Sequence, residues 1–216
     1  MLKVYVSDIS KELMRENDDD YFKRLLLRVS KQRKEKVISL KNRKDQLRSI
    51  FVYLLALKAV NAMLKETGKP PANEIVFSYG ENGKPVLLSE DGMKVNMSHS
   101  GNYVACVAGR ENAGIDIQVF KGYKDSVVKR YFSPTEQEAL KEDETCEKAF
   151  YDIWVQKEAY IKYTGLGMKQ PLSGFNVLGL EHEKTVCFSV SEECSLAVCC
   201  DKQVPVCEKV VFETLV

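Results

Sequence analysis

A long apolar segment in the N-terminal half constrains the fold more than any other feature. From Asp45 to Glu66, apolar residues recur at helical spacing, and Gly68, Pro70 and Pro71 follow as stop signals. The apolar positions are Leu47, Ile50, Phe51, Leu54, Leu55, Leu57 and Met63. The segment therefore predicts one long helix that ends before Gly68.

Short strand-like segments surround this helix. Alternation from Leu2 to Val6 predicts a first strand, and Asp18 to Asp20 precede a helical pattern that runs from Tyr21 into a basic stretch. Further strand signals lie at residues 75–78, 95–97, 103–108 and 115–120, with glycine-containing turns between them.

The second part of the chain mixes helices and strands in a similar order. Ser133, Pro134 and Glu136 form a capping-box pattern that starts a helix. A second helix is expected over residues 147–164, and strand-like runs finish the chain at residues 186–190, 196–200 and 210–212. The pattern predicts an α+β fold of two comparable halves, residues 1–112 and 113–216. A chain of 216 residues with 44% hydrophobic residues can bury a core in either one or two packed domains.

The charge is distributed unevenly. Residues 23–48 hold eleven Lys or Arg against Glu35 and Asp45, which gives this segment a net charge of +9 in a chain of net charge +1. Such a block favours a polyanionic partner, which could be a nucleic acid, a phosphate-rich small molecule or an acidic protein. A solvated helix face explains the block equally well.

The N-terminus lacks the charged, apolar and small-residue order of a signal peptide, and we expect no apolar run to reach the roughly 20 residues of a membrane span. The seven cysteines form no CxxC pair and are interpreted as free thiols. We therefore expect a cytoplasmic protein that has no membrane partner.

Two segments carry oxygen-rich side chains. In the expected strand at residues 114–118, Asp116 and Gln118 share one face because side chains alternate. If the helix that carries Glu158 packs across that face, three oxygen donors meet, which suits Mg²⁺. The alternatives are a solvated sheet face and an ordinary surface ion pair between Glu158 and Lys162, four residues apart.

The segment from Met97 to Gly101 contains Ser98, His99 and Ser100 and is expected to form a turn between strands. Its hydroxyls, backbone N–H groups and imidazole can bind a phosphate. A structural turn is the commoner meaning of this tripeptide. A serine hydrolase is disfavoured because Ser98 and His99 are neighbours and no G-x-S-x-G motif is present.

Four motifs in register resemble the Sfp-type 4′-phosphopantetheinyl transferases. They are Asn82-Gly83-Lys84-Pro85, Met97-Ser98-His99-Ser100, Gly114-Ile115-Asp116-Ile117-Gln118, and residues 154–162 (WVQKEAYIK) with Gly165-Leu166-Gly167. The resemblance implies a monomer of two similar α+β halves related by a pseudo-twofold axis, with coenzyme A and Mg²⁺ held between them. It also implies transfer of the 4′-phosphopantetheine arm of coenzyme A to a serine of an apo acyl or peptidyl carrier protein.

The resemblance also assigns roles to single residues. Asp116, Gln118 and Glu158 correspond to the metal site, and Glu158 to the base that acts on the carrier serine. Lys162 and His99 complete the implied catalytic set. The residues placed against coenzyme A are Arg33, Lys36, Arg48, Gly83, Lys84, Pro85, Ser98, His99, Ser100 and Lys162.

One departure matters, because the family commonly has a second acid where this chain has Gln118. A neutral ligand leaves the metal site one negative charge poorer, so we expect activity with weaker Mg²⁺ binding. Two alternatives stay open: a related protein that binds coenzyme A or carriers without turnover, and a nucleic-acid-binding protein that uses the basic block.

The segment 121–132 is expected to receive the carrier, while Tyr131 and Phe132 pack into the core.

Overall fold

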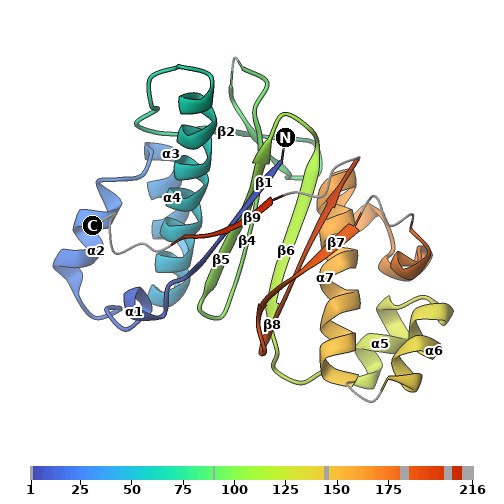
Figure 1. Cartoon of the computed structure of the whole chain (residues 1–216). Coiled ribbons are helices and arrows are strands. Elements are labelled where there is room, and N and C mark those ends of the chain that lie inside the picture. The colour runs from blue at the N-terminus through green and yellow to red at the C-terminus, as the bar shows by residue number, and fades with distance from the viewer. Residues whose placement is uncertain (1, 90, 144–145, 181–184, 202–205, 211–216) are drawn as a thin grey trace.

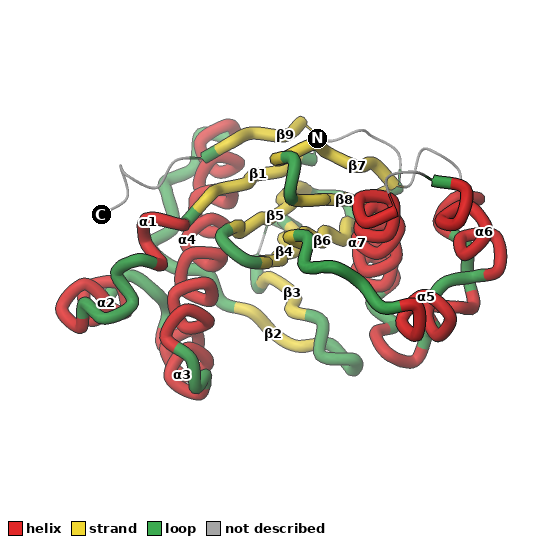
Figure 2. The backbone as a smooth tube through the Cα atoms, turned by 90° about the horizontal axis from the view of Figure 1, so that it is seen from below, coloured by secondary structure: helices red, strands yellow, loops and turns green. Residues whose placement is uncertain are grey.

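The computed structural model describes residues 2–89, 91–143, 146–180, 185–201 and 206–210. Its elements form four layers, in which helices on each side cover two sheets that lie between them (Figure 1). Viewed from below, the helical groups lie at opposite ends with the strands in the middle (Figure 2).

The first half begins with a strand and a group of helices and continues with two pairs of strands. Its elements are β1 (Lys3–Asp8), α1 (Ser10–Leu13), α2 (Asp19–Leu26), α3 (Lys31–Ser39), α4 (Arg43–Glu66), β2 (Phe77–Tyr79), β3 (Pro85–Leu87), β4 (Lys94–Ser100) and β5 (Tyr103–Gly109).

The second half contains a further long helix and ends on a strand that crosses back to the first sheet. Its elements are β6 (Ala113–Val119), α5 (Asp125–Tyr131), α6 (Pro134–Glu142), α7 (Cys146–Thr164), the 3₁₀ turns η1 (Gly167–Lys169), η2 (Leu172–Gly174) and η3 (Val177–Gly179), β7 (Thr185–Ser191), β8 (Cys194–Cys200) and β9 (Val206–Lys209).

The two halves repeat one topology. The first sheet has the order β4-β5-β1-β9, and the second has the order β6-β8-β7, with the hairpin β2-β3 apart from both. In each half an opening strand, β1 or β6, is followed by a long helix, α4 or α7, and then by a hairpin whose second strand pairs antiparallel with the opening strand. This repetition confirms the predicted α+β fold of two similar halves.

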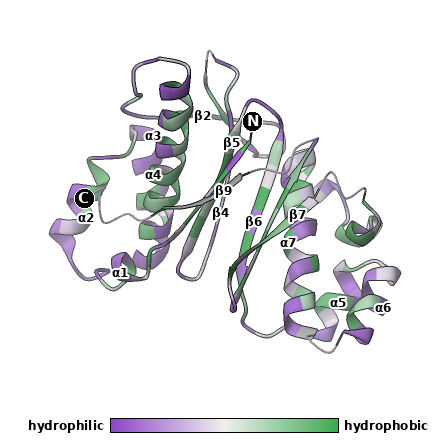
Figure 3. Cartoon of the chain, in the orientation of Figure 1, coloured by the Kyte–Doolittle hydropathy of each residue, from purple (hydrophilic) through white to green (hydrophobic). Residues whose placement is uncertain are grey.

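The two largest parts of the core lie on the two faces of the first sheet, and smaller clusters lie between α7 and β8 and among α5, α6 and α7. One face packs on α4 through residues such as Tyr5, Val104 and Cys106. The other packs on the second sheet, where Val4 and Val6 belong to the same cluster as residues of β6 and β8. Hydrophobic residues accordingly gather on the strands and on the long helices (Figure 3).

The helix predicted from Asp45 forms as α4, and it starts two residues earlier because Asn42 caps it. By length and composition α4 could cross a membrane, contrary to the expectation that no apolar run is long enough. In this fold 67% of its apolar window is buried, so it serves as the core helix of the first half.

Several boundaries differ from the sequence expectation. The basic stretch forms two helices, α2 and α3, because Ser30 caps a new helix where one continuous pattern was expected. The last strand is β9, whereas the run expected at residues 210–212 lies partly outside the described residues. Among the cysteines whose burial the structure describes, Cys106, Cys194, Cys199 and Cys200 are buried in strands, while Cys187 and Cys207 are exposed.

A buried ion pair joins α7 to α6. Lys157 lies on the apolar face of α7 and has no exposed side-chain surface, and its Nζ donates to both oxygens of Glu136 at 2.8 and 2.6 Å. Glu136 also accepts the backbone N–H of Ser133 and of Val177, and the Phe175 carbonyl accepts from Lys157. Glu136, which closes the predicted capping box, thus also neutralises buried Lys157. The ion pair and its additional hydrogen bonds offset the free energy needed to remove both charges from water.

The position of α7 depends on Gly114 in β6. A Cβ atom at this residue would lie 2.1 Å from the Ala159 carbonyl oxygen and 2.4 Å from the Tyr163 nitrogen. Both are backbone atoms, which cannot rotate away. Glycine therefore permits the close contact that lays α7 across the face of β6.

We expect Gly114→Ala to displace α7 from β6, and hence Glu158 and Lys162 from Asp116. Overpacking of this kind costs about 1–3 kcal/mol of unfolding free energy, and a shift of about 1 Å at a reacting centre can lower kcat about 100-fold. Urea unfolding measures the loss of unfolding free energy, and an assay of the transfer that the resemblance implies measures the loss of kcat.

Gly174→Ala is the matched control, because its Cβ would meet only Pro171 atoms at 3.9 Å. Wild-type stability and turnover in Gly114→Ala would contradict the role given to this contact.

Candidate active site

The two sheets meet along β4 and β6, which are edge strands, and side chains join them. The backbone N–H groups of Ile115, Ile117 and Val119 point out of the second sheet. Three side chains of β4 accept them: Asn96 Oδ1 at 3.0 Å, Ser98 Oγ at 3.4 Å and Ser100 Oγ at 3.1 Å. The edge of β6 is thereby satisfied without a backbone ladder.

The Ser-His-Ser segment is therefore strand and not the expected turn. Ser98, His99 and Ser100 pair with Ala105, Val104 and Tyr103 of β5, and the turn follows at Gly101. Because side chains alternate along a strand, Ser98 and Ser100 face β6 while His99 faces the opposite side.

Asp116 is the centre of the polar contacts at this joint. Its carboxylate is 3% exposed. The Ser98 hydroxyl donates to Oδ1 at 2.7 Å, Lys162 Nζ donates to the same oxygen at 2.7 Å, and the Gln118 amide donates to Oδ2 at 3.1 Å. Three hydrogen-bond donors therefore stabilise one buried negative charge.

Lys162 binds across the joint and not along its own helix. In addition to Asp116, its Nζ donates to the Ile115 carbonyl at 2.9 Å and to Ser98 Oγ at 3.2 Å. The expected surface ion pair between Glu158 and Lys162 is not formed in the described part of the chain, because Asp116 takes the lysine.

Glu158 is left without a hydrogen bond or an ion pair among the described residues. Burial, followed by the nearby charge of Asp116, raises the pKa of the Glu158 carboxyl, and Lys162 lowers it only as a weaker influence. Two acids from different elements thus approach each other with one of them uncompensated. Carboxylate oxygens in such a pair fit a divalent cation, which would remove their mutual repulsion.

Gln118 lies beside these acids with both ends of its amide engaged. Its nitrogen donates to Asp116, and its oxygen accepts from the Ser100 hydroxyl at 3.2 Å. The oxygen that could bind a metal thus faces Ser100. The described residues contain no group of three His, Cys, Asp or Glu side chains with metal-binding geometry.

His99 projects into a cavity of about 280 Å³ between α3 and β4. One side of the imidazole is open to solvent, and protein atoms surround the rest of it. Burial lowers the pKa of His99, and the charges of Arg48 and Lys162 add to this effect. The cavity is lined by Arg33, Lys36, Leu40, Asp45, Ser49, Val52, Pro85, Met97 and His99.

The three basic residues of the first half that are expected to contact coenzyme A differ in how firmly other groups already hold them. Arg33 is 7% exposed and lies over the Tyr53 ring. Arg48 is held by Asp45 at 2.7 Å and by the Gly101 carbonyl at 2.7 Å. Lys36 is an exposed residue that has no partner among the described residues. Its ammonium is partly desolvated by the surrounding protein, which, followed by the Arg33 charge, lowers its pKa. Lys36 is therefore available to an anion without breaking an existing bond.

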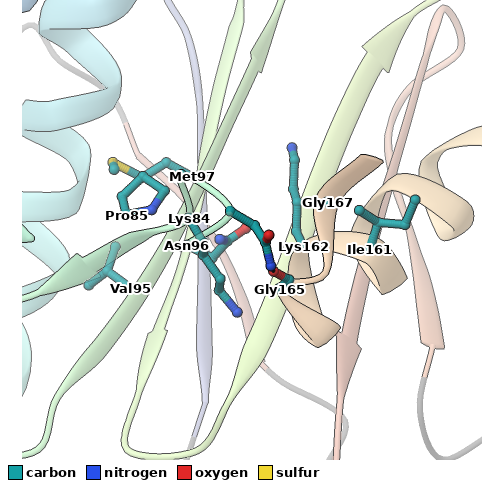
Figure 4. A pocket seen from close by; sticks show the side chains of 11 residues that line it. Lys84, Pro85, Val95, Asn96, Met97, Ile161, Lys162, Gly165 and Gly167 are labelled. Atoms are coloured by element: carbon teal, nitrogen blue, oxygen red, sulfur yellow. The ribbon is translucent and has the colours of Figure 1, made fainter. Parts of the chain in front are cut away.

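A second cavity of about 240 Å³ adjoins the first, and Pro85 and Met97 line both. Lys162 of α7 and Lys84 of the turn before β3 line it from different elements, with Gly165 close to Lys84 (Figure 4). Burial lowers the pKa of Lys84. The whole lining is Asn82, Gly83, Lys84, Pro85, Val95, Asn96, Met97, Ile161, Lys162, Gly165 and Gly167.

The structure thus brings Asp116, Gln118, Glu158 and Lys162 together. Of the residues expected to contact coenzyme A, those that line the two adjoining cavities are Arg33, Lys36, Gly83, Lys84, Pro85, His99 and Lys162. Arg48, Ser98 and Ser100 line neither cavity, because their side chains are engaged by neighbouring groups. Sequence reasoning missed Asn96, although its alternation with Ser98 and Ser100 was a usable signal for a polar strand face. It also missed Asn112, which follows no pattern and contacts α7 from the link between the halves.

Comparisons with known proteins identify the family of this chain. Residues 16–111 match the family model for the N-terminal part of 4′-phosphopantetheinyl transferases, and residues 112–206 match the model of the 4′-phosphopantetheinyl transferase superfamily.

Similar proteins bear the same description. A 4′-phosphopantetheinyl transferase of Bacillus subtilis is 30% identical over 213 residues, which cover 92% of each chain. The transferase Sfp of Bacillus subtilis strain 168 is 29% identical over 82% of this chain and 76% of its own. The transferase AcpT of Escherichia coli O157:H7 is 31% identical over 65% of this chain and 72% of its own. The chain therefore belongs to the Sfp-type 4′-phosphopantetheinyl transferase family.

Proposed function

We propose that this enzyme transfers 4′-phosphopantetheine from coenzyme A to a serine of an apo acyl or peptidyl carrier protein, with Asp116, Glu158 and Lys162 at the reacting centre. Membership of the family makes coenzyme A its co-substrate and a carrier protein its acceptor. The observation that supports the assignment of residues is the uncompensated Glu158 carboxylate beside buried Asp116.

The reaction forms one bond and breaks another. The serine oxygen of the carrier bonds to the β-phosphorus of coenzyme A, and the bond from that phosphorus to the bridging oxygen breaks. The bridging oxygen leaves with 3′,5′-adenosine bisphosphate, and the serine proton passes to Glu158. Glu158 suits this task because its carboxylate lies beside Asp116 and has no hydrogen bond or ion pair to another described residue, so it is free to accept the proton.

The remaining residues stabilise charge. Lys162 is within reach of Asp116 and is partly exposed to the adjoining cavity, so its ammonium can approach the pyrophosphate while Asp116 orients it. Asp116 and Glu158 would hold Mg²⁺. The bound ion would neutralise negative charge that develops on the transferred group.

The cavity that contains Lys36 and His99 fits the 3′-phosphate of coenzyme A. It presents Arg33, Lys36 and His99 with one acid, Asp45, which Arg48 already pairs. A phosphate placed there would meet a local excess of cations. This assignment gives the basic segment a small-molecule partner, and the family relationship favours neither a nucleic-acid-binding role nor binding without turnover.

The carrier is proposed to dock on residues 121–132. Tyr151 of α7 fixes the start of this segment, because its hydroxyl accepts from the Lys121 N–H and donates to the Gly122 carbonyl, both at 3.0 Å. Tyr123 stacks on Phe150 with ring centroids 4.6 Å apart. The segment is thus held in place before a partner arrives.

This segment combines an apolar depression with exposed cations. A cavity of about 240 Å³ between α5 and α6 includes Val128, Leu140 and Lys129. Lys121, Lys124, Lys129 and Arg130 are exposed. Carrier proteins present an acidic helix beside the modified serine, and such a helix fits this surface. Phe132, as expected, packs in the core at 1% exposure, and Tyr131 packs edge-on against Trp154.

Mass spectrometry of an apo carrier protein incubated with coenzyme A, Mg²⁺ and the enzyme tests the function itself. We expect an added phosphopantetheine mass with the wild type. Asp116→Ala and Glu158→Gln should lower turnover by at least about 100-fold, since one loses the orienting charge and the other the base. Gln118→Ala should have a much smaller effect.

In Mn²⁺ titrations followed by paramagnetic resonance, both acid variants should bind the ion more weakly, and undiminished binding would refute the metal assignment.

The role of Lys36 can be separated from folding by the choice of substrate. Because its ammonium has no partner to lose, Lys36→Ala should raise the KM for coenzyme A about tenfold, equivalent to one charge-assisted hydrogen bond of about 1.4 kcal/mol, with little change in kcat. The rise should be smaller with 3′-dephospho-coenzyme A. Lys31→Ala on the same helix is the control, and equal losses with both substrates would argue against a 3′-phosphate contact.

Charge reversal tests the docking segment. Lys129→Glu with Arg130→Glu should raise the KM for the carrier and weaken its dependence on salt, because charge steers the encounter. Calorimetric binding of coenzyme A should stay unchanged. Lys23→Glu in α2 with Arg28→Glu two residues after it changes the net charge equally and serves as the control, because α2 lies on the opposite side of the molecule from α5 (Figure 1). An unaltered carrier KM in the first double variant would place docking elsewhere.

A further inference from the structure

The C-terminal end of α7 is held by groups that lie outside the second half. The last carbonyls of a helix have no partner within the helix and need donors from elsewhere. The Tyr163 carbonyl accepts from Asn112 Nδ2 at 2.8 Å and from Lys84 Nζ at 3.1 Å. The Gly165 carbonyl accepts from Asn82 Nδ2 at 3.0 Å.

Asn112 connects the donors to one another. While its amide nitrogen donates to Tyr163, its oxygen accepts from Lys84 Nζ at 3.3 Å. Lys84 is partly buried, which lowers its pKa, so these acceptors compensate a charge that has lost solvent. A cation at this end of a helix also interacts favourably with the helix dipole.

Two tight turns bring these groups into contact. Gly83 has φ 76° in the turn that carries Asn82 and Lys84, and Gly165 has φ 72° where α7 ends. A Cβ at Gly165 would lie 3.3 Å from Lys84 Cδ. The turn of the first half is therefore packed directly on the end of the helix of the second half.

The location matters because the proposed reacting groups lie on the same last turns of α7. Lys162 directly precedes Tyr163, and its Nζ must reach Asp116 in the other element of the site. Gly114 fixes the distance between α7 and β6, whereas the donors at Tyr163 and Gly165 fix where the helix ends. A shift of about 1 Å in such a group can cost about 100-fold in rate.

We infer that Asn112 is a positioning residue for transfer: together with Asn82 and Lys84 it anchors the end of α7 to the first half and so holds Lys162 against Asp116. Asn112 touches none of the reacting atoms. This inference rests on the proposed function, because it needs Lys162 at the reacting centre.

Asn112→Asp is the sharpest variant. It keeps an acceptor for Lys84 but replaces the donor to the Tyr163 carbonyl with an oxygen that repels it. We expect kcat to fall about 10- to 100-fold, with the KM for coenzyme A changed less than threefold. Amide hydrogen exchange in the last turn of α7 should become faster, while the unfolding midpoint stays near that of the wild type. Asn73→Asp, the same change at an exposed residue between α4 and β2, should leave kcat and exchange in α7 unaltered.

A second variant covers the case in which Asn112→Asp does not fold. Asn82 is exposed, so Asn82→Ala removes its bond to Gly165 with little risk to the core. It should lower kcat several-fold and speed exchange near Gly165. Unchanged kcat and unchanged exchange in the folded variants, with a wild type that modifies the carrier, would overturn the inference. A wild type that modifies no carrier would instead overturn the proposed function.

Discussion

The joint between β4 and β6 determines how the two halves meet and where the residues of the candidate site lie. Each strand lies at the edge of its sheet, and an edge strand has a row of backbone groups that need partners. A continuous ladder would have merged the sheets. Instead, the side chains of Asn96, Ser98 and Ser100 accept the N–H groups of β6, so the sheets touch without fusing. Polar side chains are thereby concentrated on the line where the two halves meet.

The same joint accounts for the placement of charge. The Ser98 hydroxyl accepts from β6 and donates to Asp116, which makes one residue both a structural link and a support for the buried carboxylate. Lys162 then completes the neutralisation of Asp116 from α7. Because Asp116 takes this lysine, Glu158 has no ion pair among the described residues, and burial, followed by the charge of Asp116, raises its pKa.

Two neighbouring charged residues of α7 therefore lie in different surroundings. Lys157 is enclosed and fully neutralised by Glu136 and by a backbone carbonyl. Glu158, the next residue, is left available. A helix turn of about 100° per residue separates their directions, so one faces the core formed with α6 while the other faces β6. Stability and chemistry are thus assigned to adjacent positions of one helix.

The sequence predicted the elements that depend on local patterns. The core helix, the capping box and the alternation in β6 follow from spacing, and the structure confirms them. It failed where partners are distant in the chain. Helical spacing alone does not identify Glu136 as the partner of buried Lys157, because the two residues lie 21 positions apart in the chain. Ser98 to Ser100 looked like a turn because pairing with β5, which makes them strand, is a tertiary property.

The arrangement also explains why a neutral residue is tolerated at position 118. A third carboxylate beside Asp116 and Glu158 would add repulsion that only a bound cation relieves. The Gln118 amide instead donates to Asp116, so this chain can assemble its joint with one fewer charge to compensate. In the proposed site, a cation would therefore be held by two carboxylates, Asp116 and Glu158, and the joint itself has one fewer charge to bury.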